Sequence, residues 1–142
     1  MNSPRLLQLH HDADDAAEAA AGLLRPHAAL APKFFYDAQG SALFDAITRL
    51  DEYYPTRTEA AILAEHGTAI ADAVRGHTGP APVIVDLGAG NCAKGAALCA
   101  LLAPQRYVAV DICAEHLAGA LAPLQREHPA LEIVGVGPDC SR

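Results

Sequence analysis

The feature that most constrains the fold is a change of pattern at residues 83–90. The run Val83–Val85 is apolar and β-branched, and it ends in Asp-Leu-Gly-Ala-Gly. A short apolar run bounded by turn residues is typical of a buried strand. Residues 93–102 then consist mainly of helix formers. The segment therefore predicts a strand, a glycine turn and a helix, in that order.

The same alternation continues to residue 136. Residues 107–110 form a second buried run closed by Asp111, residues 114–128 have a helical pattern, and residues 132–136 form a third run. Strands that alternate with helices of about 10–15 residues indicate a parallel, right-handed β-α-β-α-β array. The sequence thus predicts the α/β class, with residues 79–142 as the first half of an α/β domain.

Residues 1–78 are expected to form a helical N-terminal region. The Gly- and Pro-rich segment 76–82 separates this region from the α/β part. Helix formers that follow acidic or hydroxyl residues mark the expected helices, which are residues 12–24, 41–49 and 56–75.

Two local features of these helices can be tested. Ser41 is a candidate N-cap for the second helix, and Thr56 and Glu59 have the S/T-x-x-E spacing of a capping box for the third. Apolar side chains at helical spacing are expected to form a core-facing surface on the second helix; they are Leu43, Phe44, Ile47 and Leu50.

The charge and the N-terminus exclude several classes of partner and location. Ten Lys and Arg against 17 Asp and Glu give a formal net charge of −7, which argues against nucleic acid or an anionic membrane as the main partner. No run reaches the ~20 apolar residues of a membrane span. The acidic N-terminus lacks the plan of a signal peptide, so a cytoplasmic protein is expected.

The cysteines and histidines do not indicate a metal site. No CxxC pair occurs among Cys92, Cys99, Cys113 and Cys140, and the seven histidines have no ligand spacing. We expect reduced cysteines that serve in packing.

The glycine turn and Asp111 together indicate a cofactor site. In open parallel sheets ligands bind outside the carboxyl ends of the strands. Gly88 and Gly90 let a ligand approach the backbone, and the following helix offers unpaired N–H groups. Asp111 ends the second strand, where a carboxylate can accept the ribose hydroxyls of an adenosine group.

Two cofactors fit this arrangement: a dinucleotide or S-adenosylmethionine. Gly88-x-Gly90-x-x-Ala93 satisfies the permissive dinucleotide pattern. Asp86, however, places an anion near the loop, which opposes a pyrophosphate and favours the methionyl amine. Lys94 could meet either a carboxylate or a phosphate. A purely structural interpretation, without any cofactor, is also open: the glycines would only form a tight turn and Asp111 would cap a helix.

Three segments resemble the S-adenosylmethionine-dependent histidine-specific Nα-methyltransferases, which make trimethylhistidine (hercynine) for ergothioneine synthesis. They are PKFFYDAQGSALFDAITRLDEYYPTRTEAAIL (residues 32–63), VDLGAGNCAKG (85–95) and YVAVDI (107–112). The first segment is long and idiosyncratic, and general methyltransferases share only the glycine loop. The resemblance implies a Rossmann-like class I methyltransferase fold, S-adenosylmethionine as cofactor and L-histidine or a related amino acid as substrate.

The resemblance also implies roles for individual residues. Gly88, Gly90 and Lys94 match positions that contact the cofactor, and Asp111 matches the ribose-binding acid. Asp139 matches an acid directed at the adenine amino group. Two tyrosines match aromatic positions at the substrate site, Tyr53 and Tyr36. The tyrosines could instead be core aromatics, Lys94 a solvated charge and Asp139 a turn residue. No catalytic base is identified.

The chain departs from the family pattern in three respects. Asp86 stands where the family usually has Glu, and Cys140 stands where it tends to have an aromatic residue. Family members also continue well past residue 142, so the chain is expected to be an N-terminal fragment truncated after the third parallel strand. Its first strand, VIVDL, would then be an unpaired edge of the sheet.

Two other functions remain open at this point. One is a NAD-dependent oxidoreductase fragment, in which Asp111 would bind the ribose of NAD. The other is an inactive truncated remnant or a binding module that pairs through its exposed strand edge. Residues 32–63 favour methyl transfer over the oxidoreductase, whereas the remnant is distinguished by whether the reading frame continues downstream of Arg142.

Overall fold

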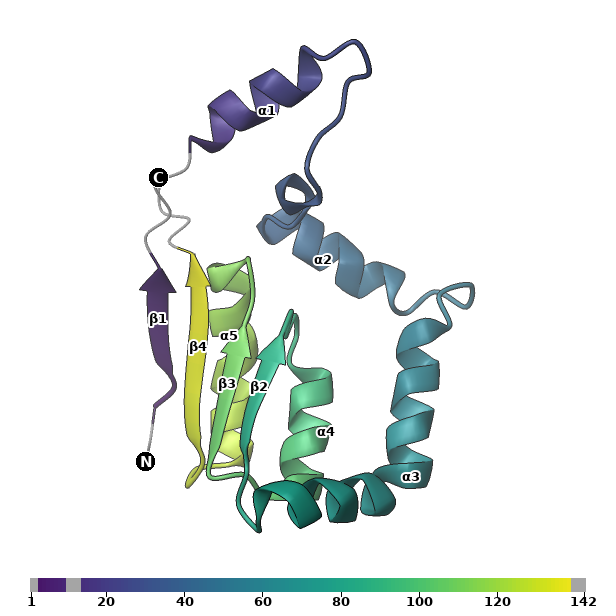
Figure 1. The fold of residues 1–142 in the computed structure, drawn as a ribbon, viewed down its shortest axis with the longest axis vertical. Coiled ribbons are helices and arrows are strands. Elements are labelled where there is room, and N and C mark those ends of the chain that lie inside the picture. The colour runs from purple at the N-terminus through teal and green to yellow at the C-terminus, as the bar shows by residue number, and fades with distance from the viewer. Residues whose placement is uncertain (1–2, 10–13, 139–142) are drawn as a thin grey trace.

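A four-stranded parallel sheet organises the molecule. The computed structural model describes residues 3–9 and 14–138. The strand order is β1-β4-β3-β2, and the strands are β1 (Arg5–Leu9), β2 (Val83–Leu87), β3 (Arg106–Val110) and β4 (Glu132–Pro138). Figure 1 shows the sheet with the helical N-terminal segments above and beside it. The α/β class and the parallel β-α-β-α-β array are confirmed.

Two helices cover one face of the sheet. α4 (Ala93–Leu102) connects β2 to β3, and α5 (Ala114–Glu127) connects β3 to β4. Side chains of alternate strand residues point to this covered face, where Ile84, Tyr107 and Ile133 are paired in register and buried. Leucines of α5 complete this core: Leu117, Leu121 and Leu124.

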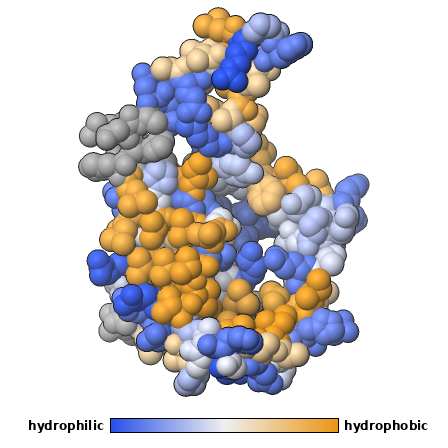
Figure 2. Space-filling model, in the orientation of Figure 1, coloured by the Kyte–Doolittle hydropathy of each residue, from blue (hydrophilic) through white to orange (hydrophobic). Residues whose placement is uncertain are grey.

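The opposite face of the sheet is open and apolar. The register aligns Val85, Val108 and Val134 in one row, and Leu87, Val110, Val136 and Leu7 in the next. Figure 2 shows the hydrophobic surface that these strands present. β2 lies at the edge of the sheet, as the sequence predicted for VIVDL, and Leu87 is 76% exposed.

The N-terminal part contains a strand that the sequence did not predict. β1 pairs in parallel with β4, far along the chain. All five of its residues are exposed, although a Leu6 methyl lies close to Gly135. The other described elements before residue 79 are a 3₁₀ turn (Pro32–Phe35) and three helices, α1 (Asp15–Leu23), α2 (Ala38–Ile47) and α3 (Pro55–Thr78).

The caps of α2 and α3 differ from those expected. Asp37, not Ser41, caps α2, because its side chain accepts a hydrogen bond from the Gly40 N–H at 2.7 Å. α3 begins at Pro55, whose fixed φ suits the first helical position, and Tyr54 precedes it without a side-chain cap. The capping box of Thr56 and Glu59 is therefore not formed.

The expected core-facing surface of α2 is also not in the core. Leu43, Phe44, Ile47 and Leu50 are all exposed. The helical spacing is present, but α2 extends over the carboxyl ends of the strands instead of packing on the sheet (Figure 1). Phe44 instead forms a T-shaped ring pair with Tyr53, with 5.9 Å between the ring centroids. None of the described helices is long and apolar enough to cross a bilayer.

Candidate functional site

The glycine loop between β2 and α4 has a backbone that requires glycine. Gly88 and Gly90 have φ values of 74° and 53°, in the left-handed region, and Cys92 follows with 58°. A Cβ atom at either glycine would meet no other atom within 4 Å. Glycine is therefore required here by the backbone conformation and not by crowding. The space beside the loop is free for a ligand.

The loop is fixed to the end of the neighbouring strand. Gly88 and Ala89 both donate their N–H groups to the Val110 carbonyl, at 2.8 and 3.0 Å. Gly90 donates its N–H to Asp111 Oδ2 at 2.8 Å, and the Cys113 N–H donates to Asp111 Oδ1 at 3.0 Å. The structure thus brings Gly88, Gly90 and Asp111 together, as the sequence predicted.

Asp111 consequently has a structural task in addition to any role with a ligand. Each of its carboxylate oxygens already accepts one backbone N–H. A carboxylate has about four lone-pair positions, so one acceptor position remains on each oxygen. The half-buried carboxylate can therefore hold the loop and still accept two hydroxyl groups.

Lys94 lies at the exposed end of a buried polar network that includes Asp86 and Tyr107. Its Nζ is 3.9 Å from Asp86 Oδ1 and 3.7 Å from Glu59 Oε1 on α3. Asp86 is only 7% exposed and accepts the Tyr107 hydroxyl at 3.0 Å. Burial raises the pKa of Tyr107 well above its usual range, so the hydroxyl keeps its proton and donates. Lys94 thereby places a cation on the first turn of α4 with part of its side chain in solvent.

The two tyrosines of the expected substrate site lie on either side of α2. Tyr36 is exposed at the end of the 3₁₀ turn, and Tyr53 is half-buried against Phe44. The contacts found in the described residues do not join either tyrosine to the glycine loop. Asp139 and Cys140 lie outside the described residues.

Cys92 and Cys99 are buried beside this network and, with Cys113, are free thiols. Burial is the main cause that raises the pKa of Cys92 and of Cys99 to about 11. They are therefore neutral packing residues at pH 7, as expected from the sequence. Within residues 3–9 and 14–138, no group of three or more His, Cys, Asp or Glu side chains is placed to hold a metal ion.

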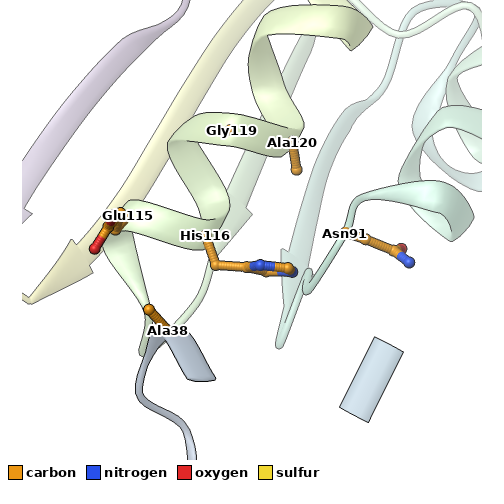
Figure 3. A pocket seen from close by; sticks show the side chains of 6 residues that line it. All are labelled: Ala38, Asn91, Glu115, His116, Gly119 and Ala120. Carbon is orange, nitrogen blue, oxygen red and sulfur yellow. The ribbon is translucent and has the colours of Figure 1, made fainter. Parts of the chain in front are cut away.

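A polar cluster beside the loop was not predicted from the sequence. Asn91 Nδ2 donates to Asp45 Oδ1 at 3.1 Å, and His116 Nε2 lies 3.4 Å from Asp45 Oδ2. Asn91 and His116 line a hollow of about 360 Å³ together with Ala38, Glu115, Gly119 and Ala120 (Figure 3). Asn91 could have been found from its place directly after Gly90. Nothing in the sequence around Asp45 indicates a site, because the apolar residues of its helix predict only a core-facing surface.

The sequence is similar to known proteins of one family. A family model described as histidine-specific methyltransferase, SAM-dependent, matches residues 15–142. The histidine N-alpha-methyltransferase of Mycobacterium tuberculosis is 38% identical over an alignment 142 residues long, which covers 93% of this chain and 43% of that protein. The protein of the same name from Mycolicibacterium smegmatis is 42% identical over 133 residues, covering 87% of this chain and 40% of the relative.

A more distant relative is named for a different acceptor. The 4-dimethylallyltryptophan N-methyltransferase of Claviceps purpurea is 36% identical over 104 residues, which cover 70% of this chain and 29% of that protein. The chain spans about two fifths of the length of the first two relatives.

Proposed function

This chain belongs to the family of histidine-specific, S-adenosylmethionine-dependent methyltransferases, and from that premise we propose that it builds the cofactor loop of an enzyme that methylates the α-amino group of L-histidine towards trimethylhistidine (hercynine). The four-stranded parallel sheet is consistent with a Rossmann-like class I methyltransferase fold. The observation that carries the proposal is the glycine loop fixed on Asp111, with Lys94 beside it.

The residues of the loop fit S-adenosylmethionine. The open space at Gly88 and Gly90 admits a ligand close to the backbone. The remaining acceptor positions of Asp111 suit the two ribose hydroxyls, and Lys94 suits the methionyl carboxylate. The Asp86 carboxylate below the loop favours the cationic end of this ligand and opposes the pyrophosphate of NAD. Asp139 is proposed, from the family resemblance alone, to bind the adenine amino group.

When bound, S-adenosylmethionine would supply an electrophilic methyl group; the amine nitrogen would bond to the methyl carbon as the carbon–sulfur bond breaks, and S-adenosylhomocysteine would be the leaving group. For this transfer the chain's own residues have to hold the reacting atoms in line and exclude water. We propose that Tyr36 and Tyr53 orient the amino acid, since both flank the helix that lies over the carboxyl ends of the strands. The α-amine has to lose a proton before each transfer, and no residue of this chain is assigned as its base.

The acceptor is the less constrained part of the proposal. Two relatives are named for histidine and one for a tryptophan derivative, so N-methylation of an amino acid is common to all three names. L-histidine is proposed because the family model and the two relatives with the greatest coverage of this chain agree on it.

The 142-residue chain alone is expected to have no turnover. The ligand crevice of such a sheet lies where the strand order reverses, beside β2, and β2 is an open edge in the described residues. Only one side of the crevice is therefore built by these residues. Detection of trimethylhistidine after incubation of the purified chain with histidine and S-adenosylmethionine would refute this expectation.

Calorimetric titration of the purified, folded chain with S-adenosylhomocysteine tests the cofactor site, with NAD as the competing ligand. We expect binding of the homocysteine product and none of NAD. Lys94→Met should weaken binding about tenfold, as expected for loss of a charge-assisted hydrogen bond. Lys33→Met is the matched control, because Lys33 pairs with Asp15 and Glu18 away from the loop. Binding of NAD, or equal affinity in the Lys94 and Lys33 variants, would contradict the assignment.

A further inference from the structure

A single carboxylate on α2 links that helix to both elements beside the glycine loop. Asp45 accepts a hydrogen bond from Asn91, which belongs to the loop, and lies 3.4 Å from His116 on α5. In Figure 3 the His116 ring extends from α5 across the hollow towards Asn91. The two oxygens of Asp45 are thus directed to two different elements.

The Asn91 side chain transmits this contact to the start of α4. Its Oδ1 accepts the N–H of Ala93, the first residue of α4, at 3.1 Å. Its Nδ2 is therefore the atom that faces Asp45. Since the preceding Gly90 N–H is bound to Asp111, two consecutive loop residues are held by carboxylates from different parts of the fold. A displacement of Asp45 would act directly on the loop that is proposed to hold the cofactor.

The pair of Asp45 and His116 is partly removed from solvent. Their side chains are 24% and 21% exposed, so the contact is less screened than an ordinary surface pair. The other charged side chain that lines the hollow is Glu115, next to His116 on α5. Ionised Glu115 carries no hydrogen-bond donor, so it does not compete with His116 for the Asp45 carboxylate.

Apolar packing contributes little to holding α2 in place. Its large side chains Leu43, Phe44 and Ile47 are exposed, and among its residues only Ser41 is buried. The polar contacts of Asp45 are consequently the main specific link between α2 and the loop. α2 in turn connects Tyr36, which precedes it, to Tyr53, which follows it.

We propose that Asp45 is a positioning residue that couples α2, and with it the segment bearing Tyr36 and Tyr53, to the conformation of the cofactor loop through Asn91 and His116. The proposal rests on the proposed function for the identity of the ligand, but the coupling itself is a property of the free chain. Coupling of this kind is reciprocal. Cofactor bound at the loop would stabilise the position of α2 in which Asp45 contacts Asn91 and His116. In the same way, α2 held in that position would increase the affinity for cofactor.

Amide hydrogen–deuterium exchange of the full 142-residue chain tests the coupling. In the free chain, Asp45→Ala should accelerate exchange in residues 38–47 and in the loop residues 88–93 about fivefold to tenfold, as expected for loss of one charged hydrogen-bonded link. Alanine is a better helix former than aspartate, so faster exchange in α2 cannot result from helix propensity. Asp72→Ala is the matched control, because Asp72 is an exposed acid paired with Arg75 on its own helix.

The second part of the experiment repeats the exchange measurement with S-adenosylhomocysteine present. In the wild-type chain this ligand should slow exchange in both the loop and α2, whereas in Asp45→Ala it should slow exchange in the loop alone. If the ligand has no effect on the wild-type loop, the proposed function fails while the free-chain comparison still decides the coupling. If exchange in the loop is the same in Asp45→Ala and Asp72→Ala, the coupling is refuted.

Asp45→Asn keeps the inference testable if the alanine variant does not fold. An amide oxygen still accepts from Asn91 Nδ2, but the negative charge facing His116 is lost. Loop exchange should then stay near the wild-type rate, while exchange at the α2–α5 contact increases. A side chain that served only to support the fold would not separate these two regions, so equal changes in both would overturn the assignment.

Discussion

Gly95 shows how a single missing side chain shapes the interior beneath the loop. A Cβ atom at this position would overlap the hydroxyl of Tyr107, which is fully buried and donates to Asp86. The absence of a side chain on α4 therefore leaves the room in which the Tyr107–Asp86 hydrogen bond forms. The buried network that ends at Lys94 depends on this space.

Gly95→Ala is expected to destabilise the chain by about 1–3 kcal/mol, the usual cost of overpacking a core, although alanine alone favours a helix by about 1 kcal/mol. Gly76→Ala is the matched control, because Gly76 lies in α3 and a Cβ there meets nothing within 4 Å. That variant should be slightly more stable than wild type. Urea unfolding curves measure both changes, and equal stability of the two variants would contradict the proposed contact.

The thiols of Cys92 and Cys99 give the molecule a pH dependence in the alkaline range. Burial raises the pKa of each to about 11, from 9.0 in the absence of the fold. Well below pH 9 the two thiols are protonated in both the folded and the unfolded chain. The free energy of unfolding therefore does not change with pH on their account. Between pH 9 and 11 the unfolded chain releases protons that the folded chain retains. The free energy of unfolding should therefore fall over this interval.

Urea unfolding at pH 7, 9 and 10.5 checks this sign, with a Cys92→Ala/Cys99→Ala double variant for comparison. The wild-type chain should lose most of this stability between the last two values, and the double variant should lose less. Tyr107 contributes in the same direction, because burial raises its pKa also, so the double variant keeps part of the slope. A wild-type stability that is unchanged up to pH 10.5 would show that the thiols are not desolvated.

At the scale of the element, the sequence predicted what local patterns determine. The core strands β2 to β4 follow from short apolar runs bounded by turn residues, and the two helices between them follow from the helix-forming stretches that separate those runs. The proximity of Gly88, Gly90 and Asp111 was predicted because topology brings the carboxyl ends of adjacent parallel strands together; their roles in binding a cofactor stay a prediction.

The elements that sequence reasoning missed depend on distant partners. β1 is defined by its pairing with β4, more than a hundred residues away, and nothing in RLLQL specifies that partner. The apolar spacing of α2 predicted a buried face, but burial requires an opposing surface, and the described residues provide none. Asp45 was missed because its role comes from contacts with two other elements.

β1 is expected to contribute little to the stability of the sheet. Its residues all keep substantial exposed surface, with Leu6 and Leu7 at 38% and 42%, so its pairing adds backbone hydrogen bonds of modest net value and only partial apolar burial. Deletion of residues 1–9 should lower the free energy of unfolding by roughly 1–2 kcal/mol. Leu121→Ala, which removes a buried side chain of α5, should cost about 2–5 kcal/mol. If the deletion costs as much as Leu121→Ala, β1 is part of the cooperative core.

At the scale of the whole molecule, the described residues cover the sheet on one face only. The covered face holds the buried core, and the open face presents valine and leucine side chains in register across the four strands (Figure 2). A contiguous apolar surface of this kind, next to an unpaired strand edge, favours association with another surface. The glycine loop lies at the carboxyl end of the same edge strand, so association there would affect the cofactor site.

The purified 142-residue chain is therefore expected to self-associate as its concentration rises. Val85 lies in the middle of β2, is 58% exposed and belongs to the apolar rows of the open face. Val85→Lys places a charge there and should shift association to at least severalfold higher concentration, as measured by sedimentation velocity. Leu24→Lys is the matched control, because Leu24 is more exposed but lies after α1, away from the sheet. If both variants associate like wild type, the open face is not the contact; if Leu24→Lys alone has an effect, the contact involves the α1 region.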